Sequence, residues 1–224
     1  MKRNVLYIII ASIIACFLLY VIERVLVVSY ETKTLWKIIF FTAIPIIYWK
    51  FFKFPSIKTQ FKKTFFLSIL LSLVTFSVIW IGFLIFGSSV DFYGIREELI
   101  LTESGYLLRG IYIIFGNSFL EEFFFRGFIF ISLYKLGLKK LSYVYSSALF
   151  AIYHIAMIQS WFELWIIFMI LAALFTVGIV FDYLCTRVSS FTGSWLVHIS
   201  ADLAIIIIGW IMFFWYSIKN NHPS

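Results

Sequence analysis

Long apolar runs, interrupted by short polar breaks, fill nearly the whole of this 224-residue sequence. A helix that crosses the hydrocarbon core of a bilayer needs about 20 predominantly apolar residues. Runs of this kind predict membrane spans at residues 5–28, 35–53, 64–87, 106–134, 142–159, 161–184 and 194–216. The sequence therefore predicts an all-α fold, a polytopic membrane helix bundle of about seven transmembrane helices.

The composition excludes an ordinary water-soluble domain. Hydrophobic residues make up 63% of the chain and charged residues 13%, whereas soluble globular chains contain about 45–50% and about 25%. The 28 Phe, 13 Tyr and 8 Trp suit a lipid-facing surface with aromatic side chains near the headgroups. The net charge of +7 lies in short loops and not in a basic stripe with interleaved aromatic residues. The expected partner is therefore the lipid bilayer, and no nucleic acid is expected.

The loop charges predict how the chain is oriented. With a cytoplasmic N-terminus, the cytoplasmic loops hold eleven of the 18 Lys and Arg residues: Lys2, Arg3, Lys50, Lys53, Lys58, Lys62, Lys63, Lys135, Lys139, Lys140 and Arg187. The opposite side holds six: Arg24, Lys33, Lys37, Arg96, Arg109 and Lys219. Because Lys and Arg accumulate in cytoplasmic loops, this bias predicts a multi-pass protein of the cell membrane with its N-terminus in the cytoplasm.

Charged side chains inside the predicted spans are few and informative. An ionisable side chain in mid-span costs about 2.5–3.5 kcal/mol on insertion scales, so those that persist usually face the bundle interior and mark function. In the fourth span, Glu122 and Arg126 are four residues apart, so they share a helical face and can pair. Glu121 lies about 100° around the helix and has no obvious local partner. A desolvated carboxylate without a partner can act as a base.

Two histidines and an aspartate interrupt the later spans. His154 follows Phe150 by one helical turn, and His198 precedes Asp202 by one turn. Two imidazoles and a carboxylate can hold a divalent metal ion or directly activate a water molecule, while a neighbouring donor stabilises the developing oxyanion. The joint pattern therefore favours a hydrolytic site over a purely structural polar network.

Three other protease designs do not match these residues. The chain has no His-Glu-x-x-His helix of the soluble metalloprotease type. Asp182 and Asp202 are the only aspartates within predicted spans, and they lack the context of a presenilin-like aspartate pair. Ser118 and Ser200 are the candidates for a rhomboid-type serine and histidine pair, but neither lies in a Gly-x-Ser-x-Gly-like setting.

Three short motifs follow one another on successive predicted helices: Glu121-Glu122-x-x-x-Arg126, Phe150-x-x-x-His154 and His198-x-x-x-Asp202. In this order they resemble the three motifs of the CPBP family, which comprises type II CAAX prenyl proteases and bacteriocin-processing or immunity proteins (Abi). The resemblance covers about residues 106–216. It divides the chain into N-terminal transmembrane helices and a loop (1–105) and a CPBP-like catalytic helix core (106–224), with the active site in its four helices.

The resemblance implies an intramembrane endopeptidase similar to the type II CAAX prenyl proteases. In such an enzyme Glu121 and His154 would activate the attacking water. His198 and Asp202 would support the oxyanion or a metal ion. Three further residues would orient the site: Glu122, Arg126 and Phe150.

The resemblance also implies a divalent metal ion, with zinc as the expected one, held by Glu121, His154 and His198. The last motif position is Asn in the prenyl-endopeptidase branch and Asp in this chain. Asn can donate a hydrogen bond to an oxyanion, whereas an ionised Asp cannot. Asp202 is therefore expected to orient His198 or to join a metal shell.

The expected substrate is a peptide or a lipidated or membrane-associated protein. Two other kinds of function stay open. A non-catalytic bacteriocin self-immunity or membrane regulatory protein of the same family would keep the polar cluster as a stabilising network. A transporter or channel would use the intramembrane charges as a proton path, but the sequence shows neither an inverted repeat nor broken helices.

Overall fold

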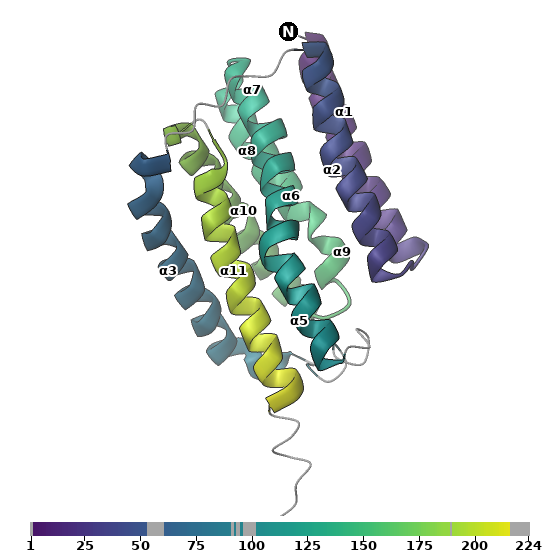
Figure 1. Cartoon of the computed structure of the whole chain (residues 1–224), viewed down its shortest axis with the longest axis vertical. Coiled ribbons are helices and arrows are strands. Elements are labelled where there is room, and N and C mark those ends of the chain that lie inside the picture. The colour runs from purple at the N-terminus through teal and green to yellow at the C-terminus, as the bar shows by residue number, and fades with distance from the viewer. Residues whose placement is uncertain are drawn as a thin grey trace, which may run out of the picture.

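The computed structural model describes residues 2–52, 61–90, 92, 95, 102–188 and 190–215, and within these ranges it contains helices and no strand (Figure 1). The N-terminal part begins with α1 (Lys2–Tyr20), which continues into the π-helical segment η1 (Val21–Val25). It goes on with α2 (Tyr30–Phe52) and α3 (Phe61–Phe86), and α3 ends in the short 3-10 turn η2 (Gly87–Ser89).

The C-terminal part begins with one long helix, here called the central helix, which runs from Glu103 to Lys135 without a turn or break. Its segments are α5 (Glu103–Ile111), η3 (Tyr112–Asn117), α6 (Ser118–Glu121), η4 (Glu122–Phe130) and α7 (Ile131–Lys135). The remaining helices are α8 (Lys139–Tyr153), α9 (Ile155–Ile158), α10 (Leu164–Val188) and α11 (Thr192–Trp210), which the π-helical η5 (Ile211–Trp215) extends.

The predicted fold class, a polytopic membrane helix bundle, is confirmed. Six helical stretches in the described part of the chain are long and apolar enough to cross a membrane: Lys2–Val25, Tyr30–Phe52, Phe65–Phe86, Lys139–Ile158, Leu164–Arg187 and Thr192–Phe214. The central helix is the seventh long helix, and it carries Glu121, Glu122 and Arg126. Each predicted span overlaps one of these helices.

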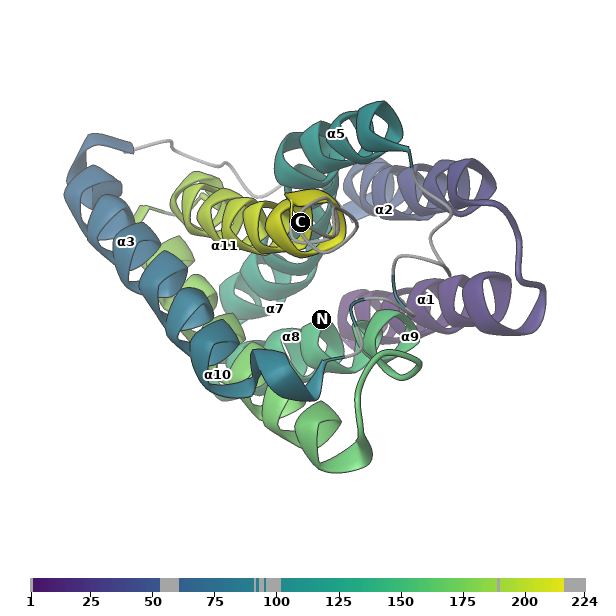
Figure 2. The ribbon, with the colours of Figure 1, turned by 90° about the horizontal axis from the view of Figure 1, so that it is seen from below.

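The helices run alternately up and down the long axis of the molecule, and the central helix lies among the others (Figures 1 and 2). The pair α1 and α2 lies on one side of it, and α3 lies on the opposite side, packed against α10 and α11. Segments of the central helix contact α1, α2, α8, α10 and α11. Side chains of the central helix therefore meet side chains from both halves of the sequence.

Aromatic side chains fill the interior between α2, the central helix and α8. The ring of Phe41 is stacked on that of Phe124, with centroids 4.1 Å apart, and meets Phe125 edge-on. All three rings are fully buried. On the outside, large apolar side chains such as Phe66 and Leu84 of α3 are exposed. This is the arrangement expected of a bundle whose outer face meets lipid.

Two π-helical segments, η3 and η4, lie on either side of Glu121 in the central helix. Hydrogen bonds in a π-helix run from residue i to i+5, and such segments occur mostly as short insertions at functional sites. Glu121 and Glu122 lie where the short α6 meets η4, and both carboxylates are buried. The locally altered winding therefore coincides with two adjacent acidic residues that both point into the protein.

The proposed domain boundary near residue 105 stays a prediction. Most of the segment just before it, including residues 96–101, lies outside the described residues. The helices on the two sides of this boundary are in direct contact, since α1 and α2 pack on the central helix.

Candidate active site

Three helical segments bring Glu121, His154 and His198 to one point inside the protein. The Nε2 atom of His154 lies 3.6 Å from Oε2 of Glu121, and the Nε2 atom of His198 lies 3.7 Å from the same oxygen. All three residues are buried. These separations exceed those of direct hydrogen bonds. The structure thus brings the three predicted residues together around one carboxylate oxygen, and their catalytic roles stay predictions.

His154 lies where α8 ends. The helix stops at Tyr153, and the chain turns at His154 before the short α9. The Nδ1 atom of His154 lies 2.7 Å from the backbone carbonyl oxygen of Phe150. Because a carbonyl can only accept, Nδ1 carries the hydrogen and the lone pair of the neutral imidazole is on Nε2, which faces Glu121. Phe150 therefore orients His154 through its backbone oxygen.

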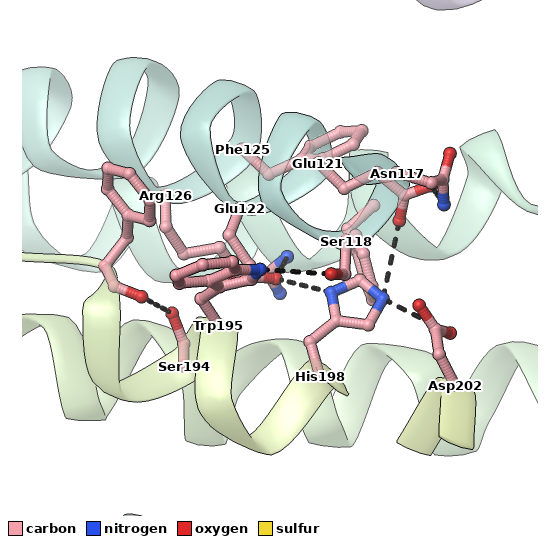
Figure 3. Close-up of polar contacts among 12 residues, drawn as sticks. Asn117, Ser118, Glu121, Glu122, Phe125, Arg126, Ser194, Trp195, His198 and Asp202 are labelled. Atoms are coloured by element: carbon pink, nitrogen blue, oxygen red, sulfur yellow. Dashed lines mark hydrogen bonds and ion pairs between the residues drawn. The ribbon is translucent and has the colours of Figure 1, made fainter. Parts of the chain in front are cut away.

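His198, in α11, is held by Glu122. Its Nδ1 atom lies 3.0 Å from Oε1 of Glu122, while its Nε2 atom faces Glu121 and lies 3.8 Å from Oδ1 of Asp202 (Figure 3). The sequence predicts that Asp202 orients His198 or joins a metal shell. In the structure the hydrogen bond that fixes the ring comes from Glu122, and Asp202 lies on the Nε2 side, beside Glu121.

The predicted ion pair between Glu122 and Arg126 is confirmed. Nη1 of Arg126 lies 3.1 Å from Oε1 of Glu122, and both side chains are fully buried. The guanidinium lies between two aromatic rings, 4.1 Å from the ring centre of Phe150 and 4.9 Å from that of Phe181. Such stacking stabilises a desolvated cation.

Asp182 of α10 is a second anion beside Arg126, and the sequence interpretation missed this role. Its Oδ1 atom lies 3.5 Å from Nε of Arg126, an ion-pair distance that is too long or poorly aligned for a good hydrogen bond. The hydroxyls of Ser146 and Ser147 donate to its two oxygens at 3.2 and 3.1 Å. The available signal was an aspartate within an otherwise apolar span, which is costly unless paired. The sequence interpretation considered Asp182 only as one member of an aspartate pair.

Glu121 has one distant and one local partner, whereas the sequence predicts no obvious local one. Nζ of Lys37, in α2, donates to Oε1 of Glu121 at 2.6 Å. The amide nitrogen of Asn117, one turn before Glu121, donates to the same oxygen at 3.0 Å. Lys37 also donates to the amide oxygen of Asn117. Oε1 is thus bound by two donors, whereas Oε2 faces the two histidines.

Lys37 also corrects the distribution of loop charges. The sequence predicts it as one of the six cations on one loop side, but it is buried inside α2. The pair with Glu121 joins residues 84 positions apart. Spacing rules for residues three or four apart in a helix cannot reveal such a contact.

The two serines considered for a serine and histidine pair have other partners. Ser118 donates to the backbone oxygen of Ile114 at 2.5 Å and accepts from the indole nitrogen of Trp195 at 3.0 Å (Figure 3). Ser200 donates to the backbone oxygen of Ser72 at 2.8 Å. Neither hydroxyl is bound to a histidine in the described part of the chain, so a rhomboid-type nucleophile is not formed.

The donor types at Glu121, His154 and His198 are those that zinc prefers, two imidazole nitrogens and a carboxylate oxygen. Both imidazoles have Nδ1 bound to an oxygen, as metal-ligating histidines usually do. The arrangement itself is looser. Across the described ranges, no group of three or more His, Cys, Asp or Glu side chains has the geometry of a metal site.

Comparison with known proteins agrees with the three motifs. A search of curated proteins and a search of solved structures found no match. Residues 103–204 match the family described as type II CAAX prenyl endopeptidase Rce1-like, and this range contains every site residue named above except Lys37. Residues 103–204 therefore form an Rce1-like domain, a domain of the type II CAAX prenyl endopeptidase branch of the CPBP family.

Proposed function

We propose that this protein is an intramembrane endopeptidase in which Glu121 and His154 activate the water that attacks a peptide bond. One observation carries the proposal. Oε2 of Glu121 faces the Nε2 atoms of His154 and His198, while Oε1 and both Nδ1 atoms are held by other hydrogen bonds. Two imidazole nitrogens thus lie within 4 Å of one carboxylate oxygen, and a water molecule bound beside these atoms would find acceptors for both of its hydrogens.

The first chemical step would be proton transfer from this water. As its oxygen attacks the carbonyl carbon of the scissile bond, Glu121 or His154 takes one proton, which general base catalysis makes faster by about 10²–10⁴. Negative charge then develops on the carbonyl oxygen. His198 donates a hydrogen bond to that oxygen once its Nε2 has taken up a proton from solvent, as an imidazolium whose Nδ1–H stays on Glu122, and donors placed in this way contribute about 10²–10³ in kcat.

The second step would break the peptide bond. The tetrahedral intermediate collapses, the C–N bond breaks, and the proton held by Glu121 or His154 passes to the leaving amine. The second proton of the water stays with the new carboxyl group until it ionises. Glu122 and Arg126 contribute by holding His198, and Phe150 by holding His154.

A divalent metal ion is a separate part of the proposal. Glu121, His154 and His198 would hold it through one oxygen and two nitrogens, and the ion would polarise a water molecule or the scissile carbonyl. Lys37 weighs against tight binding, because its ammonium lies 2.6 Å from the carboxylate that would be a ligand. Metal analysis of the purified protein and of its His154→Ala and His198→Ala variants tests this part. Stoichiometric metal that both variants lose would support it.

We further propose that the substrate is a membrane-associated peptide or protein, with or without a lipid, and that the N-terminus is cytoplasmic. Burial of the site among helices that suit a bilayer supports the first statement. The distribution of Lys and Arg between the loops supports the second.

The decisive experiment replaces Glu121 by Gln and His154 by Gln and measures cleavage in membranes. The probes are a fluorogenic farnesylated CAAX peptide and the same peptide without the lipid. Each replacement should lower kcat by roughly 10²–10⁴ because the general base is lost. Glu163→Gln is the matched control, since Glu163 is exposed and its carboxylate accepts from the indole nitrogen of Trp165, away from the site. Undiminished cleavage by Glu121→Gln would refute the catalytic proposal and favour a non-catalytic immunity or regulatory protein.

A further inference from the structure

We propose that Lys37 is a positioning residue of this active site, which holds the Glu121 carboxylate so that Oε2 stays directed at His154 and His198. The inference rests on the proposed function. It adds a residue that lies outside the matched domain, residues 103–204, and in the half of the chain that carries none of the three motifs.

The contacts of Lys37 fix its ammonium group firmly. Nζ donates to Oε1 of Glu121 at 2.6 Å and to the amide oxygen of Asn117. It also lies 5.6 Å from the ring centre of Phe41 and 5.0 Å from that of Tyr153, within the range of cation–π attraction. The cation is thus surrounded by two oxygen acceptors and two aromatic faces that come from α2, the central helix and α8.

The consequence for Glu121 follows from its two oxygens. Oε1 accepts from both Lys37 and Asn117, whereas Oε2 has no hydrogen-bond partner among the described residues and faces the two imidazoles. Rotation of the carboxylate out of this orientation would break both hydrogen bonds to Oε1. A carboxylate bound on one side only is therefore held with its free oxygen in one direction.

The chemistry needs this restraint. Without Lys37, the buried Glu121 carboxylate would face the two imidazole nitrogens, and no other Lys or Arg among the described residues forms an ion pair with it. Arg126 is already paired with Glu122 and Asp182. A buried lysine is costly in a membrane span and persists mainly where it has a partner and a function. In general base catalysis, displacement of the base by about 1 Å can lower the rate by about 10².

The test compares Lys37→Met with Lys33→Met in the full-length protein, using the two peptides named above. Lys33 is the matched control because it lies one turn earlier in α2 and is also ion-paired, to Glu23 at 2.8 Å, away from the site. Lys37→Met should lower kcat on the order of 10² with KM changed less than about threefold, which is the pattern of a misplaced catalytic group. Lys33→Met should match the parent protein. A Lys37→Met variant with the kcat of the parent overturns the inference, and so does one whose loss lies in KM alone.

A second variant covers the case in which Lys37→Met does not fold. Lys37→Arg keeps the positive charge beside Glu121, so the fold is preserved, but a planar guanidinium cannot place its donors where the ammonium does. It should lower kcat by about 10 or more with an unchanged thermal midpoint, and a parental kcat overturns the inference. Failure of the proposed function can be told apart from failure of this inference. If the Glu121→Gln variant still cleaves the peptides, the proposed function is refuted. If the Glu121→Gln variant is inactive and the Lys37→Met variant is active, only the role of Lys37 is refuted.

Discussion

At the scale of single residues, the two oxygens of Glu121 have different surroundings. Oε1 is bound by donors, and Oε2 faces two nitrogen atoms that can accept a proton. The adjacent Glu122 has another task, because its carboxylate joins Arg126 to His198. Two acidic residues that are neighbours in sequence therefore serve different purposes, one at the proposed reaction centre and one in its support.

Asp182 gives a prediction about stability. Asp182→Asn leaves the buried Arg126 with Glu122 as its remaining anion, and removal of one member of a buried ion pair costs roughly 3–5 kcal/mol. The free energy of unfolding, measured by denaturant titration in detergent micelles, should fall by about that amount. Ser147→Ala is the control and should cost about 1 kcal/mol, since it removes a single hydrogen bond. An Asp182→Asn protein as stable as its parent would show that the pair with Arg126 contributes little.

At the scale of helices, close contact between α8 and α10 places Asp182 beside Ser146 and Ser147. A Cβ atom at Gly178 would lie 2.8 Å from Cβ of Ser147 and 3.0 Å from its backbone Cα. Small residues let membrane helices approach this closely. One turn beyond Gly178, Asp182 accepts hydrogen bonds from Ser146 and Ser147. The packing of one glycine thus determines whether these hydrogen bonds can form.

Gly178→Ala should separate α8 from α10, because the obstructing atoms include backbone that cannot move alone. Overpacking of this kind costs about 1–3 kcal/mol, so the thermal midpoint should fall. Gly82→Ala is the matched control, since a Cβ at Gly82 in α3 would meet nothing within 4 Å. Ala forms helix better than Gly, so the control should be neutral or slightly stabilising. Equal effects of the two substitutions would argue against close packing at Gly178.

At the scale of the whole molecule, the site is assembled from both halves of the chain. The central helix carries Glu121 and contacts α2 from the N-terminal half as well as α8 and α11 from the C-terminal half. The link between α1 and α2 lies at the opposite end of the bundle from the link between α7 and α8 (Figure 1). The orientation in the membrane therefore decides which of these two links faces the cytoplasm.

Labelling of single cysteines tests the proposed orientation. Ser29 in the first link and Lys139 at the second are both exposed, and each can be replaced by Cys. The native Cys16 and Cys185 are buried. A membrane-impermeant maleimide added to intact cells should label Ser29→Cys and leave Lys139→Cys unlabelled until the cells are opened. The reverse pattern would place the N-terminus outside.

The features that could be predicted from the sequence are those that depend on neighbouring residues. A run of about 20 apolar residues is a local property, and it predicts a membrane helix whatever the rest of the chain does. The pairing of Glu122 with Arg126 also follows from a four-residue spacing on one helix. Each of the three motifs is likewise a spacing within one helix, so its residues could be named as candidates for one site.

The partners of these residues were decided by tertiary packing. Lys37 lies 84 residues before Glu121, Asp182 lies on a different helix from Arg126, and His198 is held by Glu122, 76 residues away, rather than by the nearby Asp202. No periodicity in the sequence states which helices become neighbours or how each is rotated about its axis. These contacts arise only when packing of small residues and aromatic rings sets the distances between helices, because a buried charge takes whichever partner that packing brings within reach.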